Sequence, residues 1–179
     1  NTGSTRTSKK TPSVKIKVSA QEVISVTVVP TIVNDDKVEL NNYRYVLYSE
    51  NGDIIKSEQI NENKSIKFDD LDAQKTYTIK LYADFDISDN KGMQYNQEIG
   101  NSTFTTLPLS KLGNLKLDVF YDSDTDITYN NINLGVAINT SKTDSRLIKI
   151  LKNITVSIQD ETNKEVEKIE INDISALSS

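Results

Sequence analysis

Two groups of acidic residues are the first candidates for chemistry in this chain of 179 residues. Each group consists of closely spaced aspartates: Asp84, Asp86 and Asp89 in one, and Asp122, Asp124 and Asp126 in the other. Calcium prefers several oxygen ligands on one tight loop, so both groups are candidate calcium sites. Neither group has the central Gly and closing Glu of an EF-hand loop. Solvated acidic turns are therefore the favoured interpretation, and calcium binding is the alternative.

The same carboxylates are the candidates for paired acid–base catalysis. The chain contains no Cys and no His. It therefore lacks a thiol nucleophile, a disulfide, the commonest general base and the commonest transition-metal ligand. No Gly-Lys phosphate loop occurs either. The sequence predicts a protein that is not an enzyme and that needs no cofactor, calcium excepted.

The charge pattern bears on the partners of the chain. The formal net charge is −5, and acidic and basic residues are mixed without a dense basic stripe. An acidic protein is repelled by phosphate backbones and by anionic lipid surfaces. No apolar run approaches the roughly 18 residues that cross a bilayer. Residues 1–12 are polar and basic, unlike a signal peptide, and are expected to form a flexible linker. The sequence predicts no nucleic-acid partner and no membrane partner.

Short stretches of alternating hydrophobicity dominate residues 13–107. Val14, Ile16 and Val18 alternate with polar residues, which is typical of a half-buried strand. A second alternating run ends where Pro30 interrupts it, and Asn51-Gly52 predicts a tight hairpin turn. Further strands are expected at 43–48, 53–60, 66–68 and 77–81, and a last one around Phe104. Seven short strands over this length predict an all-β antiparallel sandwich.

The segment from Leu71 to Ile79 resembles the tyrosine corner of fibronectin type III domains. Tyr77 follows Leu71 at the spacing of that family, although Ala73 stands where the family commonly has Pro. Residues 102–106, with Phe104, resemble the last strand of the family, and residues 43–48 resemble its central strand. The resemblance implies a fibronectin type III-like domain over residues 13–107. The usual Trp of the second strand is missing, so aliphatic residues around Ile24 and Val26 are expected to fill the core.

Residues 108–179 are similar to a degenerate second copy. Alternating runs at 115–119, 132–138 and 154–158 predict strands, and residues 167–174 echo residues 64–71. The sequence ends just before a second tyrosine corner, so we expect a partial sandwich without its C-terminal strands. Such a half-sandwich exposes its apolar face and its sheet edges. We expect that the native polypeptide continues or that another chain covers this face. Residues 144–151 predict a short helix, favoured as a core plug over a docking helix.

Two further features are candidate recognition elements. Four tyrosines in or near the central strands could stack sugars: Tyr43, Tyr45, Tyr48 and Tyr82. Packing in the core is the favoured interpretation, because alternate tyrosines in central strands usually bury their rings. Residues 91–100 are expected to form the loop before the last strand. Lys91, Met93 and Tyr95 are its candidate contacts, with an ordinary surface loop as the favoured alternative.

A looser resemblance concerns the biological context. Residues 82–86, Gly92, residues 104–109 and Leu112-Gly113 together look like tandem modules in structural proteins of phages that infect Gram-positive bacteria. This resemblance implies a non-catalytic structural or interaction module of a virion, in a tail, baseplate or host-attachment fibre. Its partners would be other subunits of a multimeric extracellular particle. The alternative is a spacer or adhesive, glycan-binding module of a bacterial cell-surface protein or secreted enzyme.

Overall fold

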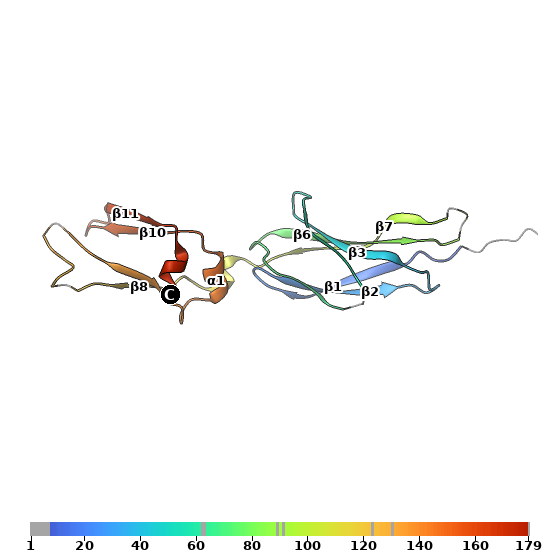
Figure 1. Ribbon diagram of the computed structural model, residues 1–179, viewed down its shortest axis with the longest axis horizontal. Coiled ribbons are helices and arrows are strands. Elements are labelled where there is room, and N and C mark those ends of the chain that lie inside the picture. Colours follow the sequence, from blue (N-terminus) through green and yellow to red (C-terminus); the bar gives the residue numbers. More distant parts are fainter. Residues whose placement is uncertain are drawn as a thin grey trace, which may run out of the picture. The chain divides into compact units, whose positions relative to one another are not determined.

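The computed structural model describes residues 8–61, 64–88, 90, 92–122, 124–129 and 131–178. The chain divides into two compact units, Asn1–Pro108 and Leu109–Ser179. Both units are built mainly of antiparallel strands, as Figure 1 shows, and one short α-helix lies in the second. The predicted all-β fold class is confirmed.

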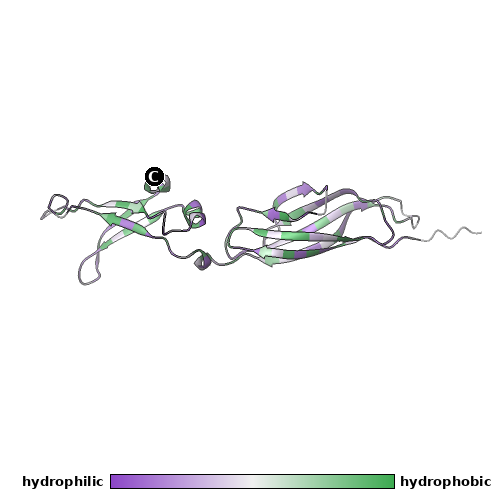
Figure 2. Ribbon diagram, turned by 90° about the horizontal axis from the view of Figure 1, so that it is seen from below, coloured by the Kyte–Doolittle hydropathy of each residue, from purple (hydrophilic) through white to green (hydrophobic). Residues whose placement is uncertain are grey.

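The first unit is a sandwich of two antiparallel sheets. One sheet has the order β1-β2-β5 and the other the order β4-β3-β6-β7. The strand bounds are β1 (Ser13–Gln21), β2 (Val26–Val33), β3 (Asn41–Tyr48), β4 (Ile54–Gln59), β5 (Ile66–Phe68), β6 (Thr76–Phe85) and β7 (Gln94–Thr105). Hydrophobic and hydrophilic residues alternate along these strands (Figure 2). Both sheets therefore turn one apolar face toward a shared core.

Strand β6 shows how this alternation builds the core. Its buried side chains are Tyr77, Ile79, Leu81, Ala83 and Phe85, and the residues between them are half-buried on the outer face. Because β6 pairs with β3 on one side and β7 on the other, its backbone hydrogen bonds are satisfied along both edges. The inner face meets Val26, Val28 and Phe68 of the opposite sheet in one continuous cluster.

The turn that leads into β6 has the geometry of a tyrosine corner. The Tyr77 hydroxyl accepts a hydrogen bond from the backbone N–H of Asp72 at 2.9 Å. Leu71 is buried, and its N–H donates to the carbonyl of Ile24 at 2.9 Å. The buried Thr106 hydroxyl ties the same turn to the end of β7, because it donates to the Asp72 carbonyl at 2.6 Å. The corner thus fixes the entry to the central strand.

Replacing Tyr77 by phenylalanine is expected to destabilise the first unit by about 1–3 kcal/mol. The ring would still fill its buried position, but the N–H of Asp72 would lose the acceptor at 2.9 Å. Urea unfolding followed by circular dichroism measures the loss. The same substitution at Tyr95, which is 66% exposed, is the control and should change the free energy of unfolding little. Equal effects of the two substitutions would contradict a stabilising corner.

Two expectations about local structure are wrong. Pro30 does not end the second strand, since β2 continues to Val33. Its missing N–H is tolerated because β5 pairs only with residues 26–28, which leaves that edge of β2 free at Pro30. The expected flexible linker does not extend to residue 12 either. The Lys9 N–H donates to the carbonyl of Ile87 at 2.9 Å, and Pro12 is buried. Residues 1–7 lie outside the described part of the chain.

The described residues of the second unit form two antiparallel strand pairs and three short helices. The elements are η1 (Leu109–Leu112), β8 (Leu117–Phe120), β9 (Gly135–Ile138), α1 (Ser145–Ile150), β10 (Ile154–Gln159), β11 (Glu165–Ile171) and η2 (Ile174–Leu177). Strand β8 pairs with β9, and β10 pairs with β11. The fully buried apolar residues of this unit are few among those described: Leu112, Ile138 and Ile154. Its core is therefore far smaller than that of the first unit.

Helix α1 begins at the cap residue Asp144, whose carboxylate accepts from the N–H of Arg146 at 2.9 Å. Hydrogen bonds from the Arg146 side chain and backbone hold the pKa of Asp144 down at about 2. The helix packs against η1, and its apolar side chains are half-buried. None of its residues is fully buried, so the role of a core plug stays a prediction.

The echo of residues 64–71 in residues 167–174 does not extend to strand pairing. Strand β5 pairs with β2, whereas β11 pairs with β10 in a local hairpin. The turn of that hairpin is stabilised by the Asp160 carboxylate, which accepts from the N–H groups of Thr162 at 2.8 Å and Lys164 at 3.1 Å. Asn163 takes the positive φ of 64° that such a tight turn needs. Local turn chemistry therefore decides the partner of β11.

Candidate interaction surfaces

An apolar cavity of about 420 Å³ lies between the two strand pairs of the second unit. Eight of its nine lining residues are aliphatic, and the ninth is Asn133. The lining residues are Ile132, Asn133, Leu134, Val136, Val156, Ile158, Ile169, Ile171 and Leu177. Cavities of this size and polarity are the usual sites of ligand and partner binding. This cavity is the main candidate site of the chain.

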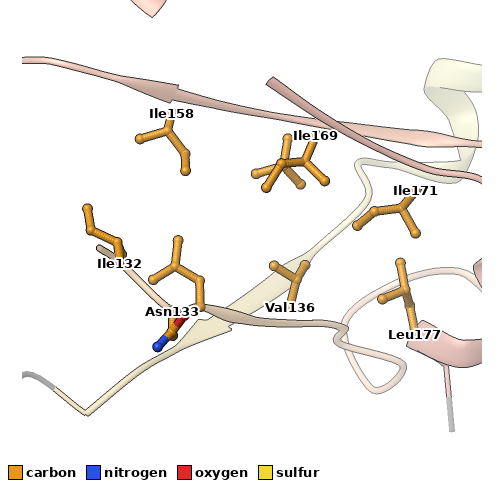
Figure 3. A pocket seen from close by; sticks show the side chains of 9 residues that line it. Ile132, Asn133, Val136, Ile158, Ile169, Ile171 and Leu177 are labelled. Carbon is orange, nitrogen blue, oxygen red and sulfur yellow. The ribbon is translucent and has the colours of Figure 1, made fainter. Parts of the chain in front are cut away.

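The strand register explains why these side chains meet. Val156 of β10 lies opposite Ile169 of β11, so both point to the same face of that pair. In Figure 3, Ile158 and Ile169 face Ile132 and Val136 across the space, and Leu177 of η2 closes one end. The cavity is thus the interior between two apolar sheet faces.

The cavity is open, and its walls are accessible to solvent. Ile132 is 53% exposed and Ile169 is 47% exposed, although both are aliphatic residues on inward faces. In the first unit, by contrast, the inward-facing Ile79 and Leu81 are completely buried. The difference arises because β5, β6 and β7 have no equivalents among the described residues of the second unit.

Unpaired backbone edges border the same cavity. In the first unit, β2 is paired with β1 and β5, and β3 is paired with β4 and β6. In the described part of the second unit, β9 pairs only with β8 and β10 pairs only with β11. Each of these strands therefore has one edge of N–H and C=O groups without a strand neighbour. Such edges are ready templates for another strand.

Exposed aromatic side chains form a separate surface on and beside the β8–β9 pair. Phe120 is 60% exposed, Tyr121 is 53% exposed and Tyr129 is fully exposed. The Phe120 ring lies over Gly135, its partner across the strand pair, where an added Cβ would come within 2.0 Å of the ring. Any larger residue at position 135 would clash with the Phe120 ring in this position.

The aspartates at 122, 124 and 126 organise a turn beside this surface. The Asp126 carboxylate accepts from the N–H of Asp122 at 2.6 Å, and the Asp122 carboxylate accepts from the N–H of Asp124 at 2.9 Å. These oxygen atoms are thus engaged with the backbone of their own loop. Backbone capping of this kind is common for aspartate in turns and accounts for its presence here.

The first acidic group is likewise tied to the backbone. The Asp84 carboxylate accepts from the N–H of Asn96 at 2.7 Å, and the Asp86 carboxylate accepts from the N–H of Ser88 at 2.7 Å. Asp89 lies outside the described residues. Across the described ranges, no three acidic side chains gather in a group that could hold a metal ion. Solvated turns stay the favoured interpretation of both groups, and calcium binding stays the untested alternative.

The four candidate tyrosines divide into two pairs. Tyr45 is buried and its hydroxyl donates to the Glu58 carboxylate at 2.9 Å, while Tyr43 packs against the same core. Tyr48 and Tyr82 lie on the outer face, and their hydroxyls are 3.1 Å apart. The Lys80 ammonium lies 5.7 Å from the Tyr48 ring centre, and the Arg44 guanidinium lies 5.4 Å from the Tyr82 ring centre. Cations therefore occupy the ring faces that a sugar would need.

Alkaline pH is expected to unfold the first unit through its tyrosines. Burial raises the pKa of Tyr43 to about 12, and burial with the hydrogen bond to Tyr48 raises the pKa of Tyr82 to about 12. The pKa values of Tyr45 and Tyr77 are also raised, mainly by burial. An unfolded tyrosine has a pKa of about 10, so stability is complete below pH ~10 and falls as the pH rises toward ~12.

Tyrosinate absorbance and circular dichroism, recorded in one alkaline titration, measure this effect. The buried tyrosines should ionise together with the loss of β-structure. Ionisation of all eight tyrosines of the chain before any loss of structure would contradict the expectation.

The expected loop at residues 91–100 is for the most part a strand. Strand β7 begins at Gln94, and Phe85 of β6 lies opposite it in the register. The sequence does not show this because residues 94–98 lie at a sheet edge and, apart from Tyr95, are polar, so no hydrophobic alternation marks the strand. Tyr95 is 66% exposed on this strand and Met93, which precedes it, is 40% exposed. Lys91 lies outside the described residues. The two described side chains are thus exposed at the start of β7, and their role in recognition stays a prediction.

Comparison with known proteins gives structural likenesses only. No protein-family model matches the sequence, and no curated protein is significantly similar to it. A segment of two fibronectin type III domains from chicken tenascin is 18% identical, with a TM-score of 0.41, over 91% of this chain and 78% of that chain. A fibronectin type III domain of the human fibronectin type III domain containing protein 3 is 15% identical, with a TM-score of 0.39, over 62% and 97%.

The sensor domain of the anti-sigma factor RsgI4 of Pseudobacteroides cellulosolvens is 15% identical, with a TM-score of 0.35, over 55% of this chain and 95% of that chain. All three TM-scores are too low to add to the fold assignment, which rests on the sheets of three and four strands and on the Tyr77 corner. The first unit is a fibronectin type III-like β-sandwich. The fold implied by the resemblance is thereby confirmed.

The sequence indicated the open apolar face but not its details. Alternating residues in 132–138 and 154–158 were enough to predict two apolar strand faces. The closure of one end by Leu177 was missed, because η2 has no periodic pattern of its own. The described residues include no helix with the length and apolar character to span a membrane.

Proposed function

We propose that this chain is a non-catalytic interaction module that joins subunits of a multimeric particle. The observation that carries the proposal is the open apolar cavity of the second unit, bordered by the free edges of β9 and β10. Contiguous apolar surface on a soluble protein marks an interaction site. Water contact with Ile132, Leu134 and Ile169 is unfavourable, so burial by a partner lowers the free energy of the assembly.

The interior of the first unit supports the absence of catalysis. The buried polar side chains among its described residues are Ser25 and Thr106, and both make hydrogen bonds inside the fold. The raised pKa values belong to tyrosines and are caused mainly by burial in the core. A catalytic site usually combines shifted acids or bases in a cleft. In the first unit, the shifted pKa values are thus those of tyrosines that pack in or against the core, which supports a structural role.

The particle that we propose is a bacteriophage virion, in its tail, baseplate or attachment fibre. The resemblance of residues 82–86, 104–109 and 112–113 to phage structural modules supports this choice, together with the acidic, Asn-rich composition. The chain would then reside in an extracellular particle beside other virion subunits. Two modular units in one chain suit the spacing and joining of such subunits.

Gradient sedimentation of a native lysate tests the proposal. The polypeptide is located with an antibody, and its mass is recorded in each fraction. We expect it to co-migrate with a fast-sedimenting particle and to stay there after a moderate salt wash, since apolar contacts resist salt. Recovery with cell walls would favour the surface-protein alternative and overturn the virion assignment. Recovery as a free monomer in the soluble fraction would overturn the role in a multimeric particle itself.

A further inference from the structure

We propose that the cavity of the second unit binds an extended β-strand of a partner subunit, with apolar residues at alternate positions and basic residues beside them. The strand would pair with the free edge of β10 and insert its apolar side chains between Ile132 and Ile169. This inference rests on the proposed function, because it names the kind of segment through which the subunits join.

The first unit shows what fills the corresponding space. Its pairs β1–β2 and β3–β4 are antiparallel neighbours in sequence, as β8–β9 and β10–β11 are in the second unit. In the first unit, β6 pairs with the other edge of β3, from Asn41 to Tyr48. The described part of the second unit provides the two pairs but no strand at the equivalent edge of β10. The backbone geometry therefore accepts one more strand.

The side chains that a filling strand must carry follow from β6. That strand turns a side chain inward at every second position: Tyr77, Ile79, Leu81, Ala83 and Phe85. The cavity in the second unit is aliphatic apart from Asn133, so an inserted polar side chain would lose its water without a partner. A strand with apolar residues at every second position matches this wall. A helix would leave the N–H and C=O groups on the free edge of β10 without partners.

Charge determines the residues between the apolar ones. Residues 115–139 contain one Lys and four Asp, so their net charge is −3. Residues 154–173 contain two Lys, four Glu and two Asp, so their net charge is −4. The two hairpins that form the cavity therefore carry a net charge of −7. Four of the eight basic residues of the second unit lie in the segment that connects the two hairpins, at Lys142, Arg146, Lys149 and Lys152.

A second copy of this face is a poor occupant for the same reason. In such a dimer each copy would contribute two hairpins with a net charge of −7, and like charges across an interface oppose association. A strand with Lys or Arg beside its apolar residues is attracted to the same surface. Electrostatics and apolar patterning thus specify the same partner segment.

A peptide-binding measurement on the full chain tests the proposal. The probe is a fluorescent peptide with the sequence of residues 76–85, extended by two lysines at each end. We expect saturable binding, followed by anisotropy, that weakens about tenfold when the four added lysines are replaced by glutamates. This difference should shrink at high salt. A peptide with proline at the positions of Ile79 and Leu81 lacks two backbone donors and should not bind.

Protein variants locate the site. Ile169→Asp and Ile132→Asp place a carboxylate on opposite walls of the cavity, and each should weaken binding at least about tenfold. Val166→Asp is the matched control, because Val166 lies on β11, is 59% exposed and does not line the cavity. Circular dichroism checks the fold of the three variants, and we expect all three to remain folded because the replaced side chains are about half exposed.

Three outcomes would overturn the inference. Unchanged binding in both wall variants would place the peptide elsewhere, and equal binding of the lysine and glutamate peptides would remove the charge argument. Self-association of the full chain that Ile169→Asp abolishes would make a second copy the occupant. Failure of peptide binding leaves co-sedimentation with a particle unaffected, so failure of this inference and failure of the proposed function are distinguishable.

Discussion

Replacing Phe68 by alanine is expected to lower the free energy of unfolding of the first unit by about 3–5 kcal/mol. Phe68 is 2% exposed and belongs to the short strand β5. Its ring meets the edge of Tyr45 at a centroid distance of 5.3 Å and stacks with Phe104 at 6.5 Å. Truncation removes both aromatic contacts and leaves a cavity that the flanking sheets cannot close. Small domains are stable by only about 5–15 kcal/mol, so much of the stability would be lost.

Chemical denaturation followed by far-ultraviolet circular dichroism measures this loss, because the chain has no Trp to report by fluorescence. Ile54→Ala is the control, since Ile54 is 65% exposed at the edge of the same sandwich. Its effect should stay within about 0.5 kcal/mol. A Phe68→Ala variant as stable as the control would show that β5 is not part of the core.

Replacing Gly100 by alanine is expected to cost about 3 kcal/mol, at the upper end of overpacking effects. A Cβ at this position would stand 2.6 Å from the carbonyl oxygen of Val14 and 3.0 Å from its Cβ. The carbonyl belongs to the backbone of β1, which is held to β2 along its length and cannot turn aside as a side chain can. The substitution therefore separates β1 from β7.

Thermal unfolding of the Gly100→Ala variant tests this expectation. Asn101→Ala, one residue further along β7 and exposed, is the matched control and should leave the midpoint nearly unchanged. The midpoint of Gly100→Ala should fall by roughly 12–24 °C, since each 1 kcal/mol shifts a domain of ~100 residues by roughly 4–8 °C. An unchanged midpoint would mean that β1 moves freely away from β7.

The sequence predicts the strands of the first unit well because the signal is local. Period-two alternation marks Val14 to Val18 and Tyr77 to Leu81 directly, and the spacing of Leu71 and Tyr77 identifies the corner. The signal fails where tertiary context decides. Pro30 reads as a strand breaker, yet it is accommodated because β5 is too short to reach it.

The candidate site follows from the sequence only in outline. Apolar alternation predicts two half-sandwich faces, but the pairing of β11 with β10 depends on the turn made by Asp160 and Asn163. Residues 94–98 give no strand signal, since none of them is fully buried and their strand conformation comes from pairing with β6. The cations over Tyr48 and Tyr82 are also invisible in sequence, because they come from cross-strand neighbours.

The contact between Gly100 and Val14 has a consequence for how the first unit responds to force. The start of β1 lies beside Gly100, and the Gln21 side chain at its end donates to the carbonyl of Thr105, so β1 and β7 run in the same direction. Tension between Ser13 and Thr105 would therefore pull β1 lengthwise along β2. Their eight register pairs would bear the load together in shear instead of opening one by one. Such a unit resists extension, which suits a link that must transmit a pull without lengthening.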